Sequence, residues 1–139
     1  MRQENKMVVV VKGVILLEGR VLIVKRAADD EVGNNTWETV GGKMELGEDI
    51  EAALIREINE EIGITVTVDK ILYATTFKTD PTRQIILLAY LCHSESHDIK
   101  LSAEHSDFKW ATKEQLELLL PPEIMKDFEQ NNVFSALGI

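Results

Sequence analysis

Three glutamates late in one amphipathic stretch have the spacing of a cation site. Glu57, Glu60 and Glu61 lie at positions i, i+3 and i+4 within residues 42–64. On a helix, with about 100° per residue, side chains at this spacing lie on one face. Like charges held this close repel one another. A hard cation such as Mg²⁺, which carboxylate oxygens bind together with phosphate oxygens and water, turns that repulsion into ligation.

The stretch around these glutamates is predicted to be a helix that starts near Glu48 and ends at Gly63 as its C-cap. The glutamates flank an apolar stripe that packs on a sheet, and burial beside the core makes unneutralised carboxylates costly. A different interpretation is an exposed helix that is rich in Glu only because Glu is a good helix former. The stripe consists of Ile50, Leu54, Ile58 and Ile62, with Ile55 beside it.

A glycine-rich segment, GGKMELG, precedes the helix and is predicted to be a tight loop. Gly41 and Gly42 let the backbone approach a ligand closely, and a glycine-rich loop at a helix N-terminus is a natural anion site. Lys43 in this loop is a candidate phosphate contact. Lys25 and Arg26, at the end of an earlier predicted strand, are either further phosphate contacts or simply a solvated strand end.

The remaining pattern predicts a sheet covered on both faces. The run at 85–91 is almost entirely apolar, as expected for a central strand with elements on both sides. One cover is the glutamate helix, and two C-terminal helices are candidates for the other. The expected strands are Met7–Leu17 (with a bulge at Gly13), Val21–Val24, Trp37–Val40, Thr65–Thr79, Ile85–Leu91 and Asp107–Ala111; the C-terminal helices start at Thr112 and at Pro122; Ala27–Thr36 and His93–Ala103 are expected loops.

Composition narrows the class of protein. The 139 residues suit a single domain spanning 1–139, with 45% apolar and 28% charged residues. A net charge of −9 argues against stable nucleic-acid binding and requires cations to bridge any anionic substrate. No apolar run has transmembrane length and the N-terminus lacks signal-peptide features. The single cysteine, Cys92, fits a reducing cytoplasm, which is the expected location.

The run from Gly42 to Ile64 resembles the Nudix box, G-x5-E-x7-R-E-U-x-E-E-x-G-U, where U is a bulky aliphatic residue, and it matches every defined position. The resemblance extends to the flanking hairpin and to the segment around Glu104 and Trp110. It implies an α/β (α+β) fold, specifically an α/β/α sandwich with a central mixed sheet. It also implies hydrolysis of a nucleoside diphosphate linked to another moiety, with Mg²⁺ or Mn²⁺ as cofactor.

The same resemblance implies roles for single residues. Glu57, Glu60 and Glu61 are the expected metal ligands, and Glu57 is alternatively the general base. The carbonyl of Gly41 is a further expected ligand. Arg56 is expected to hold the glutamates in place, since a guanidinium clamps carboxylates bidentately. Glu48 is also expected near the metal, directly or through water. Outside the Nudix box, a further catalytic acid is expected from a loop, with Glu104 the first candidate and Asp107 the second.

Several alternatives stay open at this point. Cys92 and the three histidines, His93, His97 and His105, allow a zinc reading, but loop histidines without a ligating role are the favoured account. The apolar tail at 133–139 packs either across a homodimer interface or onto its own domain. The substrate order favours nucleoside triphosphates over ADP-ribose-like compounds and dinucleoside polyphosphates. The competing functions are a non-catalytic nucleotide-sensing module and a metal-buffering domain.

Overall fold

The computed structural model describes residues 4–27 and 35–139, so most of the expected loop at 27–36 lies outside the described residues. The described residues form a seven-stranded sheet and four helices. The strands are β1 (Lys6–Leu17), β2 (Arg20–Arg26), β3 (Trp37–Glu38), β4 (Val40–Lys43), β5 (Thr67–Asp80), β6 (Arg83–His93) and β7 (His105–Ala111). The helices are α1 (Ile50–Ile62), α2 (Lys113–Leu119), α3 (Pro122–Gln130) and α4 (Val133–Leu137).

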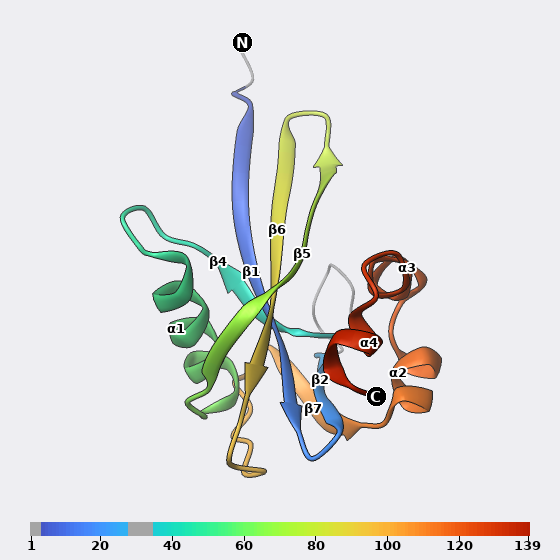
Figure 1. Ribbon diagram of the computed structural model, residues 1–139. Helices are drawn as coiled ribbons and strands as arrows, with labels where there is room; N and C mark the ends of the chain where they lie inside the picture. The colour runs from blue at the N-terminus through green and yellow to red at the C-terminus, as the bar shows by residue number, and fades with distance from the viewer. Residues whose placement is uncertain (1–3, 28–34) are drawn as a thin grey trace.

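The sheet is mixed, as predicted. Its main path runs β3-β2-β1-β6-β5, with β4 paired to β1 and β7 paired to β2 (Figure 1). The β1–β6 pair is parallel, whereas β1 pairs antiparallel with β2 and with β4. Glu18 and Gly19 both have positive φ, of 52° and 77°, and form the tight turn that joins β1 to β2.

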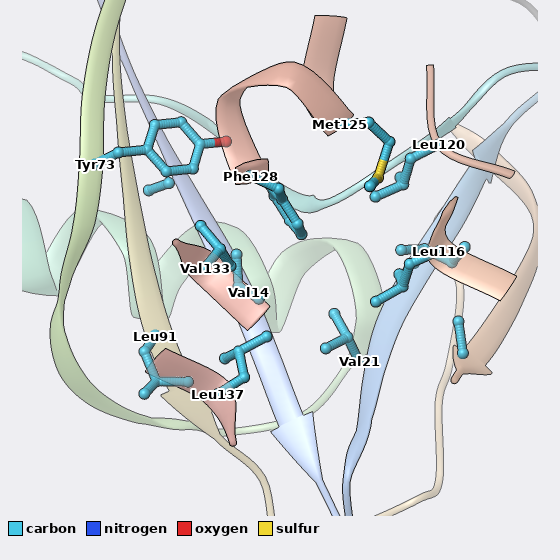
Figure 2. Packing of buried hydrophobic residues seen from close by; sticks show 13 residues of the cluster. Val14, Val21, Tyr73, Leu91, Leu116, Leu120, Met125, Phe128, Val133 and Leu137 are labelled. Carbon is cyan, nitrogen blue, oxygen red and sulfur yellow. The ribbon is translucent and has the colours of Figure 1, made fainter. Parts of the chain in front are cut away.

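Helices cover both faces of this sheet. Helix α1 lies on one side and α2, α3 and α4 lie on the other (Figure 1). Under α1, Leu54, Ile58 and Ile62 pack against β1 and β6. On the opposite side, Figure 2 shows Leu116 and Phe128 of the C-terminal helices facing strand residues. The predicted α/β/α sandwich is therefore confirmed.

Helix α1 begins one residue after its N-cap, Asp49, and ends at Gly63, whose φ of 71° is the left-handed conformation of a C-cap. The buried stripe is one position shorter than predicted, because Ile50 is 38% exposed. Helical side chains point back toward the N-terminus, so the side chain of the first helical residue extends past the strands that cover the rest of the stripe. Leu54 and Ile58 are fully buried as predicted.

Gly13 is not a bulge: β1 keeps one continuous register with β6 through this residue. Gly13 instead leaves space for side chains that pack against β1. A Cβ at this position would lie 2.9 Å from Ile58 Cδ1 and 3.3 Å from Cys92 Sγ. The missing side chain therefore lets α1 approach the sheet closely, which brings the carboxylates of α1 near the strand backbone.

Gly41 and Gly42 belong to strand β4 rather than to a loop, because both pair with β1. The C-terminal tail forms α4, whose Val133 and Leu137 are buried in the core of the same chain (Figure 2), so the second of the two packing alternatives holds. No helix within the described residues is both long and apolar enough to span a membrane.

Candidate active site

Glu61 is a buried carboxylate at the contact between α1 and β4. Its residue is only 7% exposed, and its Oε2 accepts a hydrogen bond from the Gly41 amide at 3.1 Å. Burial raises the pKa of Glu61 to about 7, against the opposing influence of Lys12 and His105. Gly41 has a φ of 152°, and a Cβ there would collide with the Val11 carbonyl oxygen. Only glycine therefore brings the strand amide this close to the helix carboxylate.

Arg56 connects the other carboxylates of the motif. Its Nε and Nη2 donate to the two Glu48 oxygens at 2.7 and 2.8 Å, a bidentate pair. Its Nη1 also lies 3.2 Å from Glu57 Oε1 and 3.2 Å from Glu60 Oε2. The hydrogen bonds from Arg56 and from the Glu45 amide lower the pKa of Glu48 to about 2. The guanidinium thus orders three carboxylates, and Glu48 is turned toward Arg56.

Glu57 and Glu60 differ in burial. The Glu57 side chain is 15% exposed and that of Glu60 is 58% exposed. Burial raises the pKa of Glu57, Arg56 opposes that shift, and Glu60 and Glu104 add to it. Gly42 is what leaves room for Glu57, because a Cβ on Gly42 would lie 2.6 Å from the carboxyl carbon of Glu57.

Glu104 and His105 bring a second segment to the same place. Within the described residues, a cluster of potential metal-ligating side chains consists of Glu61, Glu104 and His105, with donor atoms that all lie within 4.8 Å of one another. Glu104 is exposed and His105 is buried. The structure therefore places Glu104, the first candidate for the loop acid, beside Glu61 of α1. Asp107, the second choice, is exposed and accepts a hydrogen bond from the Phe108 amide.

Lys12 and Glu38 were not predicted as site residues, and His105 was considered only as a zinc ligand, but the structure places all three near Glu61. Lys12 Nζ and Arg26 Nε lie 3.0 Å from the two oxygens of Glu38. Burial alone would raise the pKa of Glu38, but Lys12, His105 and Arg26 outweigh it and lower the pKa to about 2. A signal was present: Lys12 is a charge inside an apolar strand, and a buried charge needs a partner.

The basic candidates for phosphate binding have different surroundings. Arg26 pairs with Glu38, as described above, and Lys25 Nζ lies 6.0 Å from the centre of the Trp37 ring. Lys43 is exposed at the end of β4, and its carbonyl accepts from Arg56 Nη2 at 3.3 Å. Of the three basic candidates for phosphate binding, Lys43 is therefore the one whose backbone contacts Arg56.

The zinc reading does not fit the structure. His93 Nε2 lies 3.0 Å from Asp69 and His97 Nε2 lies 3.3 Å from Glu18, both on the surface. His105 lies apart from them in the carboxylate cluster. The interpretation of all three as loop histidines is wrong for two, because His93 ends β6 and His105 begins β7.

The residues present fit a hard divalent cation. Burial raises the pKa values of Glu57 and Glu61 despite the nearby Arg56 and Lys12, so the charged form of each carboxylate would be stabilised by a further positive charge. The adjoining Glu60 and Glu104 offer further oxygen donors. Oxygen-rich sites of this kind bind Mg²⁺ and Mn²⁺ in preference to softer metals.

Comparison with known proteins agrees with this geometry. The family model of the NUDIX domain matches residues 7–131. A nucleoside triphosphatase NudI from Enterobacter sp. (strain 638) is 34% identical over 116 residues, which cover 76% of this chain and 82% of that protein. The CTP pyrophosphohydrolase of Escherichia coli (strain K12) is 33% identical over 133 residues, covering 95% of this chain and 94% of that protein. The crystal structure of a MutT protein from Methanosarcina mazei Go1 superposes with a TM-score of 0.83 at 25% identity, covering 96% of this chain and 99% of that one.

The fold is a mixed sheet between α1 and the C-terminal helices, and glutamates of α1 lie beside the glycines of β4. This combination of fold and site is that of a hydrolase of the Nudix class. The chain belongs to the Nudix family, since the family model covers most of its length. It is a Nudix pyrophosphohydrolase, an enzyme that cleaves phosphoric anhydride bonds.

Proposed function

We propose that this enzyme hydrolyses nucleoside triphosphates at a pyrophosphate bond, with Mg²⁺ as cofactor and Mn²⁺ as a substitute. The observation that carries the proposal is the approach of the buried Glu61 to Glu104 and His105, with donor atoms within 4.8 Å, and the nearby Glu57, whose pKa the charge of Glu104 helps to raise. The names of the relatives, a nucleoside triphosphatase and a CTP pyrophosphohydrolase, support nucleoside triphosphates ahead of ADP-ribose-like compounds and dinucleoside polyphosphates.

The proposed ligands of the cation are the carboxylates of Glu57, Glu60 and Glu61 and the carbonyl of Gly41, with Glu48 contributing through water. A bound divalent cation supplies charge neutralisation for the diphosphate and for the transition state. Arg56 keeps the three carboxylates that it contacts oriented.

Substrate contacts and proton transfer complete the proposal. Water attacks a phosphorus atom, and its proton passes to Glu57 or to Glu104, two acids close enough for the charge of Glu104 to raise the pKa of Glu57. Lys43 and Gly42 are proposed to contact phosphate oxygens. Lys25 and Arg26, at the end of β2, are proposed as further phosphate contacts.

The test is a substrate panel. Ribo- and deoxyribonucleoside triphosphates, ADP-ribose and dinucleoside polyphosphates are incubated with Mg²⁺, with Mn²⁺ or with EDTA, and the products are separated by ion-exchange chromatography. We expect a nucleoside monophosphate and pyrophosphate from at least one triphosphate, and no product in EDTA. Tight nucleotide binding without turnover under either metal would instead establish a nucleotide-sensing module.

The wider assignments are part of the same proposal. Residues 1–139 act as one catalytic domain without stable nucleic-acid binding, which the net charge of −9 supports. The free, buried Cys92 is consistent with a reducing cytoplasm. A homodimer remains a prediction, and light scattering of the purified protein measures it directly.

Gly42→Ala is expected to lower turnover by about 100-fold, because the added Cβ displaces the Glu57 carboxylate and a shift of about 1 Å in a reacting group costs this much. The φ of Gly42 is not in the left-handed region, so the melting temperature should change little. The control is Gly19→Ala in the β1–β2 turn, where φ is 77° and no atom lies within 4 Å of the added Cβ. That variant should lose stability and keep its turnover; equal turnover in both variants would remove Glu57 from the mechanism.

A further inference from the structure

His105 is buried without a hydrogen-bond partner. Its side chain is 2% exposed, and neither ring nitrogen has a partner among the described residues. A neutral imidazole carries one N–H donor and one acceptor nitrogen. Buried polar groups in folded proteins are nearly always satisfied, so an exception requires an explanation. The strand pairing does not supply one: His105 begins β7, and its pairing with Arg26 involves the backbone and not the imidazole.

The surroundings of the imidazole are acidic. One ring nitrogen lies within 4.8 Å of carboxylate oxygens of both Glu61 and Glu104. Nε2 also lies 4.0 Å from Glu38 Oε1, which is too far for a hydrogen bond. Glu38 is already held by Lys12. The imidazole therefore adjoins three carboxylates and bonds to none of them.

The spacing within the cluster matches the needs of a cation. Donors about 2.1 Å from an octahedral cation lie roughly 3.0 to 4.2 Å apart. The donor atoms of Glu61, Glu104 and His105 lie within 4.8 Å of one another, so small side-chain rotations bring them into this range. A cation here would also satisfy the unpaired ring nitrogen.

We propose that His105 is a nitrogen ligand of the divalent cation, together with Glu61 and Glu104, and that it makes this site prefer Mn²⁺ to Mg²⁺. Mg²⁺ prefers oxygen ligands and near-ideal octahedral geometry, whereas transition metals accept imidazole readily. A metal-ligating histidine usually donates its other N–H to a carboxylate, and with Nδ1 on the cation the carboxylate nearest to Nε2 is that of Glu38, at 4.0 Å. This inference rests on the proposed metal site and adds a ligand and a metal preference to it.

The experiment measures metal binding without nucleotide. Mn²⁺ affinity of the wild type and of His105→Gln is determined by EPR titration of free Mn²⁺, and Mg²⁺ affinity by competition. We expect His105→Gln to weaken Mn²⁺ binding by about 10- to 100-fold and to leave Mg²⁺ binding within about 3-fold, since glutamine keeps a polar oxygen donor. The matched control, His93→Gln on the surface, should bind both metals like the wild type.

Pulsed EPR of the Mn²⁺-loaded wild type decides whether imidazole is a ligand. Coupling to an imidazole nitrogen is expected in the wild type and in His93→Gln, and its absence from the wild type would overturn the proposal even if His105→Gln fails to fold. An equal loss of both metals in His105→Gln would also overturn it, and would make His105 a positioning residue. Nitrogen coupling in a protein that turns over no nucleotide would keep this inference and reject the proposed function instead.

Discussion

Glu61→Gln is expected to reduce the turnover of the metal-loaded enzyme by at least about 100- to 1000-fold, the loss typical of removing one group that stabilises transition-state charge. The variant has the same shape and keeps an oxygen that can accept from the Gly41 amide. The fold should therefore persist while the charge that binds the cation is gone. Single-turnover kinetics with saturating Mg²⁺ measure the loss, and unchanged turnover would refute the proposed mechanism.

The same variant has a second, independent signature in the metal-free protein. The pKa of Glu61 is about 7 in the folded state, against an ordinary value of 4.5. Because this carboxylate has its pKa raised by folding, its ionisation destabilises the wild type progressively as the pH rises from about 5 through 7. Above pH 7 the melting temperature of Glu61→Gln should exceed that of the wild type, and the difference should vanish near pH 4. Glu51→Gln, an exposed change on the same helix, should alter neither turnover nor this pH dependence.

Leu116→Ala is expected to lower the free energy of unfolding by about 2–5 kcal/mol, the cost of a large-to-small change in a packed core. Leu116 is fully buried where α2 meets β2 and β7, and it lies among the residues of the second cover (Figure 2). Urea unfolding followed by circular dichroism measures the change, provided that the slope stays constant.

Helix α2 supplies its own control. Leu118 lies two positions further along and is 81% exposed. Leu118→Ala should therefore change the free energy of unfolding by less than about 0.5 kcal/mol. If the two leucines proved equally costly, the packing of α2 on the sheet described above would be wrong.

Much of the fold was predictable because local patterns and tertiary structure agree. The C-cap at Gly63 and the helix start at Thr112 lie where the sequence predicts them, and the turn at Glu18 and Gly19 falls between the first two predicted strands. Errors occurred where a distant contact decides the conformation. Gly41 and Gly42 suit a loop by composition, but pairing with β1 makes them a strand.

The site was predictable along the helix and only in part beyond it. Spacing within one helix fixes the relative positions of Glu57, Glu60 and Glu61, so a sequence pattern is sufficient for them. Glu38 and His105 come from separate strands, and their approach to Glu61 depends on sheet register. No local pattern encodes that register.

The parallel pairing of β1 with β6 has a consequence for how the chain reaches its native state. This pairing joins residues 6–16 to residues 83–93, so the centre of the sheet closes only after most of the polypeptide is available. Non-local contacts of this kind slow folding. During synthesis the apolar β1 leaves the ribosome well before its partner, and exposed apolar segments in incomplete chains promote aggregation. A chaperone that shields residues 7–17 during synthesis should therefore raise the yield of folded protein more than one that acts on the C-terminal helices.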